Sequence, residues 1–396
     1  MRFSLGAAAM GGLVILAQAA DCYTTSSTAQ TDALAANALA KLVDYAAHNA
    51  GPKPKCTEKN VAKRREWGSL SVAERVAYTN AVKCLMTKPS KFDPAAVPGA
   101  KSLYDDFVAV HINQTLSIHF TGNFLSWHRY FTWAYEQALR NECGYKGYQP
   151  YWNWGRWAQN PLDSPLFDGG VGSIGGNGDY VPHGCSQALP NGLNCIPPGT
   201  GGGCVTTGPF ANMTANLGPL SLTLSGIPGL ENLDPAANPY TYNPRCLRRD
   251  VSSWVSQQWL NDRNTTDLII ENDNIADFQY VMQGDDFADG NFGVHTAGHF
   301  TIGGDPAGDF FVSPGDPAFY LHHAQIDRVW WIWQNQKPKE RTNTVAGTLT
   351  FQNNPPSRDA TLEDIVEMEH LATPRPMKQL MSTVGLKDSP LCYVYI

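Results

Sequence analysis

Ten histidines occur in this chain, and six of them form two groups of three that could hold metal ions. His295 and His299 lie four residues apart, so a helix would place both imidazoles on one face, one turn apart. A single pair with this spacing arises often by chance. Two groups of three, each with one member inside a strongly patterned segment, are hard to reach by accident. The groups are His111, His119 and His128, and His295, His299 and His323.

The chemistry of imidazole narrows the choice of metal. Imidazole suits copper, zinc, iron and nickel, and copper(II) heads the divalent affinity series. Dinuclear iron sites in helical bundles use glutamates and Glu-x-x-His pairs, which these two groups do not offer. A zinc peptidase of the HExxH type needs a glutamate after its first histidine, but Thr296 follows His295. Two all-imidazole sets leave open positions on each ion, which favours a small bridging ligand such as dioxygen.

Helices are the elements that must position these histidines. Apolar side chains recur at helical spacing from Asn123 to Asn141, around His128. Residues 165–245 are instead rich in Gly, Pro and Asn, and we expect their cysteines to pin long loops. Further helices are predicted over residues 32–50, 71–84, 251–260, 274–282 and 321–336.

These histidines and their neighbours resemble the two copper signatures of the tyrosinase and catechol oxidase family, the type 3 copper proteins. The first signature is similar to residues 119–129, and the second to residues 316–327. By this resemblance His111 takes the place of the first ligand of copper A. The last ligand of copper B falls on His323, and the neighbouring His322 is expected to pack beside the site.

The resemblance spans roughly residues 100–335 and is strongest to the short, secreted fungal polyphenol oxidases. It implies a mainly α fold, a four-helix bundle around a dinuclear copper site with long disulfide-pinned loops. It implies two copper ions per chain, with dioxygen and small phenolic substrates as partners. The function implied is oxidation of o-diphenols (catechols) to o-quinones, with some members also hydroxylating monophenols or methoxyphenols. Two alternatives stay open: haemocyanin-like reversible oxygen binding without turnover, and a zinc hydrolase.

The resemblance also assigns roles to side chains beside the ions. Phe300 would overhang copper B as a substrate gate, or else belong to the bundle core. Phe319 would pack under the site. Asp327 would orient a ligand from one turn beyond His323, and its alternative is a surface carboxylate paired with Arg328.

Three of the positions that depart from the family pattern concern the surroundings of the ligands. Members often carry a cysteine cross-linked by a thioether to the second copper A ligand, but Ser117 stands there, so no cross-link to His119 is expected. Many tyrosinases have Asn after the first copper B ligand, together with a Glu whose water helps to deprotonate monophenols. Here Thr296 and Gln283 take these places. We therefore expect weak or selective hydroxylation of monophenols.

The first twenty residues are typical of a secretory signal peptide. Arg2 supplies the positive charge, an apolar stretch follows, and residues 17–19 offer a cleavage site with small residues. We expect residues 21–396 to form a single catalytic domain, without a separate C-terminal lid domain, that is secreted to the extracellular space. Most of the nine cysteines should pair there, with the connectivity and the ninth cysteine left open. The candidate glycosylation sites are Asn113, Asn212 and Asn264.

Composition excludes some kinds of partner. The formal net charge of −7 argues against nucleic acid and anionic membrane surfaces. After the signal peptide, no apolar run reaches the roughly 18 residues that a membrane span requires. The sequence leaves the oligomeric state and the natural phenolic substrate open.

Overall fold

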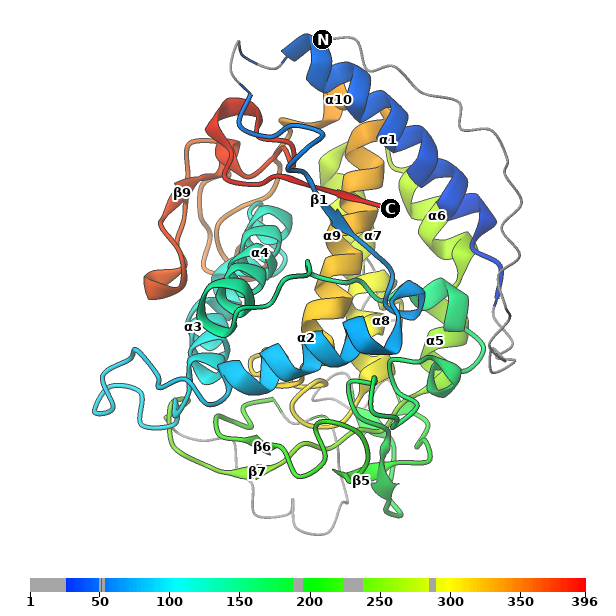
Figure 1. The fold of residues 1–396 in the computed structure, drawn as a ribbon, viewed down its shortest axis with the longest axis vertical. Coiled ribbons are helices and arrows are strands. Elements are labelled where there is room, and N and C mark those ends of the chain that lie inside the picture. Colours follow the sequence, from blue (N-terminus) through cyan, green and yellow to red (C-terminus); the bar gives the residue numbers. More distant parts are fainter. Residues whose placement is uncertain are drawn as a thin grey trace.

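The computed structural model describes residues 26–49, 51, 54–187, 195–221, 223, 238–284 and 290–396. The predicted signal peptide and Cys22 lie outside these ranges. Helices dominate the described part of the chain, as the mainly α prediction requires (Figure 1). They are α1 (Ala29–Asn49), α2 (Val72–Leu85), α3 (Leu103–Ile118), α4 (Phe124–Cys143), α5 (Ser253–Trp259), α6 (Asp262–Glu271), α7 (Ile275–Gln283), α8 (Gly293–Ile302), α9 (Ala318–Gln336) and α10 (Pro338–Arg341).

The strands are short and pair only two at a time in the described ranges. β1 runs parallel to β10, and the other pairs, β2 with β5, β3 with β4, β6 with β7 and β8 with β9, are antiparallel. Their bounds are β1 (Ala62–Arg64), β2 (Gly178–Tyr180), β3 (Ser186–Gln187), β4 (Cys195–Ile196), β5 (Gly202–Val205), β6 (Thr214–Ala215), β7 (Arg245–Cys246), β8 (Ile365–Val366), β9 (Arg375–Pro376) and β10 (Tyr393–Tyr395).

Helix α9 is the centre of the bundle. Every residue from Ala318 to Asn335 is buried, so this helix has no solvent face and must be surrounded by other elements. Helices α4 and α8 pack directly against it, and α3 packs against α4. Figure 1 shows α9 standing between α3 and α4 on one side and α1 and α6 on the other. The four helices α3, α4, α8 and α9 carry the two histidine groups, which confirms the predicted bundle.

Helix α4 illustrates how the sequence forms these elements. Its apolar stripe, Phe124, Trp127, Phe131, Tyr135 and Leu139, is completely buried, as the spacing predicts. The helix ends at Gly144, whose φ of 68° is accessible to glycine without steric cost and whose N–H bonds the carbonyl of Leu139. The buried stripe and the glycine after Cys143 together set the extent of α4, which carries His128.

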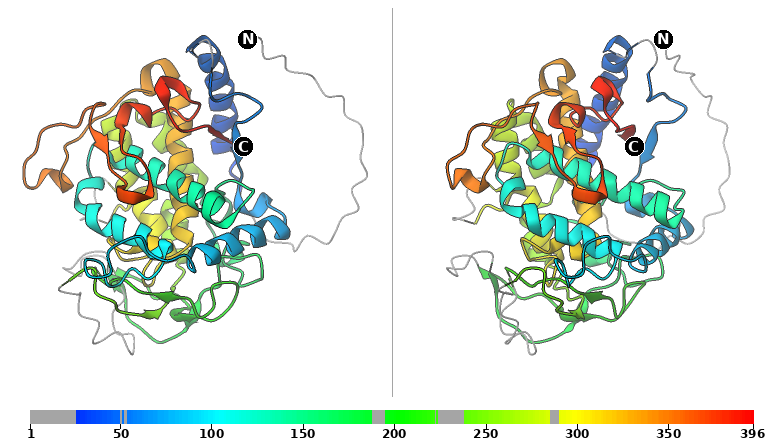
Figure 2. Two further views of the ribbon diagram at one scale, coloured as in Figure 1. Left: turned by 60° about the vertical axis from the view of Figure 1, so that its left-hand side comes forward. Right: turned by 90° about the vertical axis from the view of Figure 1, so that its left-hand side faces the viewer.

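The part of the chain that follows α4 and precedes α5 in the sequence is mostly irregular and forms one end of the molecule. Figure 2 shows the segments with β5, β6 and β7 gathered below the helices in both views. Two disulfides, Cys185–Cys195 and Cys204–Cys246, lie within it, and the predicted disulfide-pinned loops are therefore confirmed. The buried Arg249 makes two hydrogen bonds, of 2.7 and 2.8 Å, to the carboxylate of Asp316 just before α9. This contact ties the loops to the bundle.

The two other disulfides join helices and chain ends. Cys84–Cys143 links the ends of α2 and α4, and Cys56–Cys392 holds the β1 region against the segment that forms β10. All eight cysteines in the described ranges are therefore paired. Within those ranges, no helix is long and apolar enough to cross a lipid bilayer.

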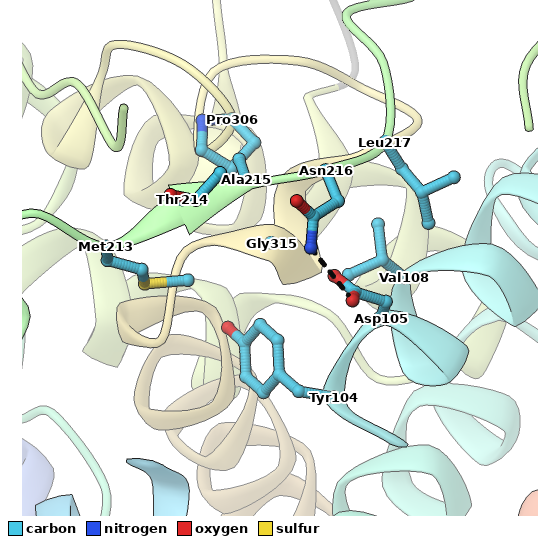
Figure 3. A pocket seen from close by; sticks show the side chains of 10 residues that line it. All are labelled: Tyr104, Asp105, Val108, Met213, Thr214, Ala215, Asn216, Leu217, Pro306 and Gly315. Carbon is cyan, nitrogen blue, oxygen red and sulfur yellow. Dashed lines mark hydrogen bonds between the residues drawn. The ribbon is translucent and has the colours of Figure 1, made fainter. Parts of the chain in front are cut away.

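A small cavity marks the place where the loops meet the start of α3 (Figure 3). Its volume is about 10 Å³, roughly the space of one water molecule. The side-chain amide of Asn216 donates a 3.0 Å hydrogen bond to Asp105, which also closes a capping box with Ser102. Burial raises the pKa of Asp105. The contact anchors the N-terminus of α3, two turns before His111.

Candidate metal centre

The six histidines singled out in the sequence converge on one place in the bundle. His111 lies in α3 and His119 directly after it, and His128 lies in α4. Their ligand nitrogens lie within 4.8 Å of one another. The nitrogens of His295, His299 and His323, from α8 and α9, form a second set with the same limit, which also includes His322. The rings of His128 and His323 stack with centroids 4.6 Å apart, so the two sets are neighbours.

Backbone carbonyls orient the first set. The Nδ1 atoms of His111, His119 and His128 lie 2.7, 2.9 and 2.8 Å from the carbonyl oxygens of Phe311, Thr115 and Phe124. A carbonyl can only accept, so each Nδ1 must carry the proton and each Nε2 keeps a free lone pair. The Nε2 atoms of His111 and His128 are buried without a hydrogen-bond partner among the described residues. Such atoms are costly unless something binds them.

The second set is held differently. The Nε2 atoms of His299 and His323 lie 3.2 Å apart. Two imidazoles on one tetrahedral ion, at metal–nitrogen distances of 2.0–2.1 Å, would place their nitrogens about 3.3 Å apart. His299 has a hydrogen bond to the backbone of Ala307. Neither ring nitrogen of His295 has a partner in the described part of the chain, although both are buried. The donor set therefore fits a second ion.

His322 belongs to the packing around this set. Its Nε2 lies 2.9 Å from the carbonyl oxygen of His295, which can only accept, so this nitrogen is a donor. Its Nδ1 faces the backbone of Gly298, where a Cβ atom would lie 2.4 Å away. Gly298 sits between His295 and His299, and only glycine leaves room for the His322 ring. The need for glycine here was not apparent from the sequence.

Burial keeps all these imidazoles neutral. Desolvation lowers the pKa of each of the six histidines, and neighbouring histidines lower it further for all except His119. The pKa of His119 falls to about 4 and that of His322 to about 3. Neutral imidazole is the form that binds metal ions, so the site is ready to take them at neutral pH. An all-imidazole donor set of this kind suits copper.

The aromatic side chains around the site divide into two classes. Phe319 stacks on His323 at 4.1 Å and meets His111 edge-on at 5.6 Å, so it contacts one ring of each set. Phe300 is buried and contacts the ring of Phe292 at 5.2 Å, which is the packing that the core alternative predicts, and its role as a gate stays a prediction. Phe310, which the sequence did not single out, lies 4.6 Å from the ring of His119.

Asp327 does not have the surroundings predicted for it. Its carboxylate accepts hydrogen bonds from Arg129 at 2.5 Å and from the hydroxyls of Tyr393 and Tyr395, each at 2.6 Å. Arg64 adds a weaker contact at 3.4 Å. Among the described residues neither a histidine nor Arg328 is a hydrogen-bond partner of Asp327. The carboxylate instead joins α9 to α4 and to the C-terminal strand.

Arg328 has a separate partner. It forms its ion pair with Asp32 of α1, whose side chain is about half exposed. Both readings of Asp327, as a histidine orienter and as the partner of Arg328, are therefore corrected.

The three residues that depart from the family pattern lie in α3, α7 and α8. The hydroxyl of Thr296 donates to the carbonyl of Gln283 at 2.7 Å, and the side-chain oxygen of Gln283 accepts from the N–H of Phe120 at 2.7 Å. Ser117 donates to the carbonyl of Gln114. Since every cysteine in the described ranges is disulfide-bonded, none of them is available for a thioether to His119.

The candidate glycosylation sites lie in α3, in a turn and in α6, and none of the three is a member of a histidine set. Asn113 is exposed on α3, and its amide donates to Glu369 at 2.8 Å. Asn212 is exposed in a turn with a φ of 64°. Asn264 lies in α6, and its amide donates to the carbonyl of Gln258.

Known proteins are similar to this chain in both sequence and fold. A family model described as the common central domain of tyrosinase matches residues 101–336. Tyrosinase P of Aspergillus terreus is 40% identical over 351 residues, which cover 87% of this chain and 94% of that protein. N-acetyl-6-hydroxytryptophan oxidase ivoB of Emericella nidulans is 35% identical over 357 residues, covering 86% and 93%.

One solved structure extends this similarity to three dimensions. It is a polyphenol oxidase variant from Thermothelomyces thermophila, and it matches with a TM-score of 0.85 and 43% sequence identity. The match covers 94% of this chain and 99% of that chain. All six histidines lie within the range of the family model.

Proposed function

The chain belongs to the tyrosinase family and is an oxidoreductase of the polyphenol oxidase type, and from that premise we propose that it oxidises small o-diphenols to o-quinones with dioxygen. The observation that carries the proposal is the pair of buried imidazole sets with free ligand nitrogens, in contact through the stacked rings of His128 and His323. Each catechol gives up two electrons and two protons, so two catechols reduce one dioxygen to two waters.

We assign one copper ion to each set. His111, His119 and His128 would hold the first, and His295, His299 and His323 the second. When bound, the ions supply dioxygen activation and the acceptance of electrons from the phenol. The protein's own part is to fix the imidazoles through backbone carbonyls and to exclude water with packed rings such as that of Phe319.

Monophenol hydroxylation is proposed to be weak. An amide side chain cannot take up the phenolic proton, and both ends of the Gln283 amide are already bonded to backbone groups. The Thr296 hydroxyl is directed to the Gln283 carbonyl. Neither residue is therefore placed to act as a base or to hold one.

The decisive experiment is metal analysis of the purified protein followed by oxygen-uptake assays. Catechol, a monophenol and guaiacol are compared side by side, with N-acetyl-6-hydroxytryptophan added because one relative is named for oxidising it. We expect two coppers per chain and fastest oxygen uptake with catechol. Copper-loaded protein that binds oxygen reversibly and leaves catechol unconsumed would replace the oxidase with an oxygen carrier.

Secretion is a separate proposal. The signal-like residues 1–20 motivate it, and the four disulfides support it because such bonds persist in oxidising compartments. Expression of the full chain in a eukaryotic secreting host should place the protein in the medium, with an N-terminus near residue 20. Retention inside the cell with an intact N-terminus would reject the proposal.

A further inference from the structure

We propose that Gln283 is a positioning residue that holds one ligand histidine of each copper set at a fixed separation. The inference rests on the proposed copper-dependent function and goes beyond it, because it assigns a structural cause for the distance between the two sets. Gln283 is the last residue of α7 and is 1% exposed. Gln283 is neither a copper ligand nor a base, because both ends of its side-chain amide are hydrogen-bonded to backbone groups.

Gln283 contacts the residue that follows a ligand in each set. Its side-chain oxygen accepts the N–H of Phe120, which comes directly after His119, at 2.7 Å. Its main-chain oxygen accepts the hydroxyl of Thr296, which comes directly after His295, at 2.7 Å. Its side-chain nitrogen donates to the carbonyl of Gln279 at 3.1 Å, which fixes the direction of the amide. One residue therefore bridges the two sets.

On the first side, the bridge holds a backbone conformation that is unusual for the residue it contacts. Phe120 has a φ of 50°, in the left-handed region that side chains other than glycine rarely adopt. It lies in the turn between α3 and α4, outside the hydrogen-bond ladder of either helix. The bond to Gln283 satisfies its N–H and so stabilises the turn that carries His119.

At the second end of the bridge, the bond between Thr296 and Gln283 takes the place of a hydrogen bond to the ring of His295. Each histidine of the first set has a carbonyl partner at Nδ1, but neither ring nitrogen of His295 has a partner in the described part of the chain. The position of His295 must therefore come from its backbone in α8. Thr296 is the next residue, and its hydroxyl fastens that backbone to the end of α7.

The corner between α7 and α8 is tight enough for this bridge to act as a spacer. Gly293, at the start of α8, has a φ of 56°, and a Cβ atom there would lie 2.3 Å from the carbonyl oxygen of Val281. The end of α7 therefore sits at a set distance from the start of α8. The rings of His119 and His295 face each other across the bridge with centroids 6.0 Å apart.

The test compares Gln283→Met with Gln279→Met in copper-loaded full-length protein. Gln279 lies one turn earlier in the same helix, is also buried, and donates its amide to the carbonyl of Ala346. Two bridged copper(II) ions are magnetically coupled and give no electron paramagnetic resonance signal, whereas separated ions give one. We expect Gln283→Met to retain copper but to show a signal from the larger part of it. Gln279→Met should stay as silent as the parent protein, with a similar melting temperature to Gln283→Met.

Two further variants keep the proposal open to refutation even if Gln283→Met fails to fold. Thr296→Val has nearly the same shape and breaks only the second end of the bridge, so it should also raise the signal. Adding Phe120→Gly to Gln283→Met should lower the signal again, because glycine adopts a positive φ without strain. A silent spectrum of copper-loaded Thr296→Val, or of Gln283→Met where that variant folds, would overturn the inference. A parent protein that binds no copper would overturn the proposed function instead.

Discussion

The two histidine sets are similar in composition but are held in place by different means. In the first set, three backbone carbonyls fix the three rings, and two of these carbonyls lie four residues earlier in the chain than the histidine they bind. In the second set, His295 has no ring partner in the described ranges, and His322 and Gly298 shape the space around it. The first set is therefore organised mostly within its own segment, and the second depends on contacts between helices.

This difference predicts an order of metal binding. A set whose ligands are ordered before the metal binds has a small free-energy cost of ordering on binding. A set that depends on packing between helices is more easily disrupted and then binds the metal less tightly. The first set should therefore bind copper without the second, and the second should not bind it without the first.

Removing one ligand from each set gives the largest expected effect and tests this order directly. Catechol oxidation should fall below detection in both His128→Ala and His323→Ala, because each variant leaves one of the two coppers without one of its ligands. His323→Ala should retain about one copper per chain, but His128→Ala should retain close to none, because its loss opens the first set and removes the ring stacked on His323. Atomic absorption of the dialysed proteins measures this. Equal copper contents in the two variants would contradict the asymmetry.

Removing the charge of Asp327 gives the next largest expected effect. Asp327 accepts from Arg129, next to His128, and lies one turn beyond His323, so it joins the helices that carry both sets. Asp327→Asn leaves the buried Arg129 without its counter-charge, and such a loss costs about 3–5 kcal/mol of unfolding free energy. Arg64 keeps its ion pair with Glu136 at 3.0 Å. Denaturant unfolding of the metal-free protein measures the change.

A matched control for this charge is available on the same helix. Asp32→Asn also removes the partner of an arginine on α9, but the Asp32 side chain is 53% exposed. Its loss should cost less than about 1 kcal/mol. If the two variants unfold at the same denaturant concentration, the buried network does not connect the sets as argued.

A substitution at Gly298 tests the packing around the second set without changing a ligand. In Gly298→Ala, the new Cβ would lie 2.0 Å from Cε1 of His322, whose ring is buried and has no room to retreat. Overpacking of this kind costs about 1–3 kcal/mol and should shift the neighbouring ligands. Thermal melting should detect the loss, and copper should fall toward one per chain. Gly172→Ala, where the nearest atom would lie at an ordinary 3.4 Å, serves as the control and should match the parent.

The sequence predicted the locally determined parts of this molecule well. The α4 stripe is buried as its spacing indicated, and the helix predicted over residues 71–84 is α2, which begins with a capping box of Ser71 and Glu74. The partners of His119 and His128 follow from the helix geometry, because they are the carbonyls one turn earlier. Helix α3 was not predicted, because every residue from Leu103 to Ile112 is buried and this segment has no exposed face to mark its period.

What the sequence could not predict comes from contacts between distant segments. The carbonyl that orients His111 belongs to Phe311, 200 residues later. Asp327 was misread because its partners Arg64 and Tyr395 are brought to it by the pairing of β1 with β10, which no local pattern reveals. Local patterns thus placed the ligands, and tertiary contacts decided the roles of their neighbours.

Thr115 gives the smallest expected effect and sharpens the contrast with Thr296. Its hydroxyl donates to the carbonyl of His111 at 2.6 Å and lies 3.4 Å from the Nδ1 of that ring. Since His111 already has the carbonyl of Phe311 at 2.7 Å, Thr115→Val should leave the ring in place and change the unfolding free energy by less than about 1 kcal/mol. Copper content and the melting temperature should stay close to those of the parent.

The same exchange at Thr296 should disturb the second set, because there the hydroxyl holds a backbone whose histidine has no ring partner in the described ranges. The two variants are therefore compared by copper titration under the same conditions. If Thr115→Val weakened copper binding as much as Thr296→Val, side chains rather than backbone carbonyls would be orienting the first set. The distinction between a set organised by its own backbone and one assembled by its neighbours would then fail.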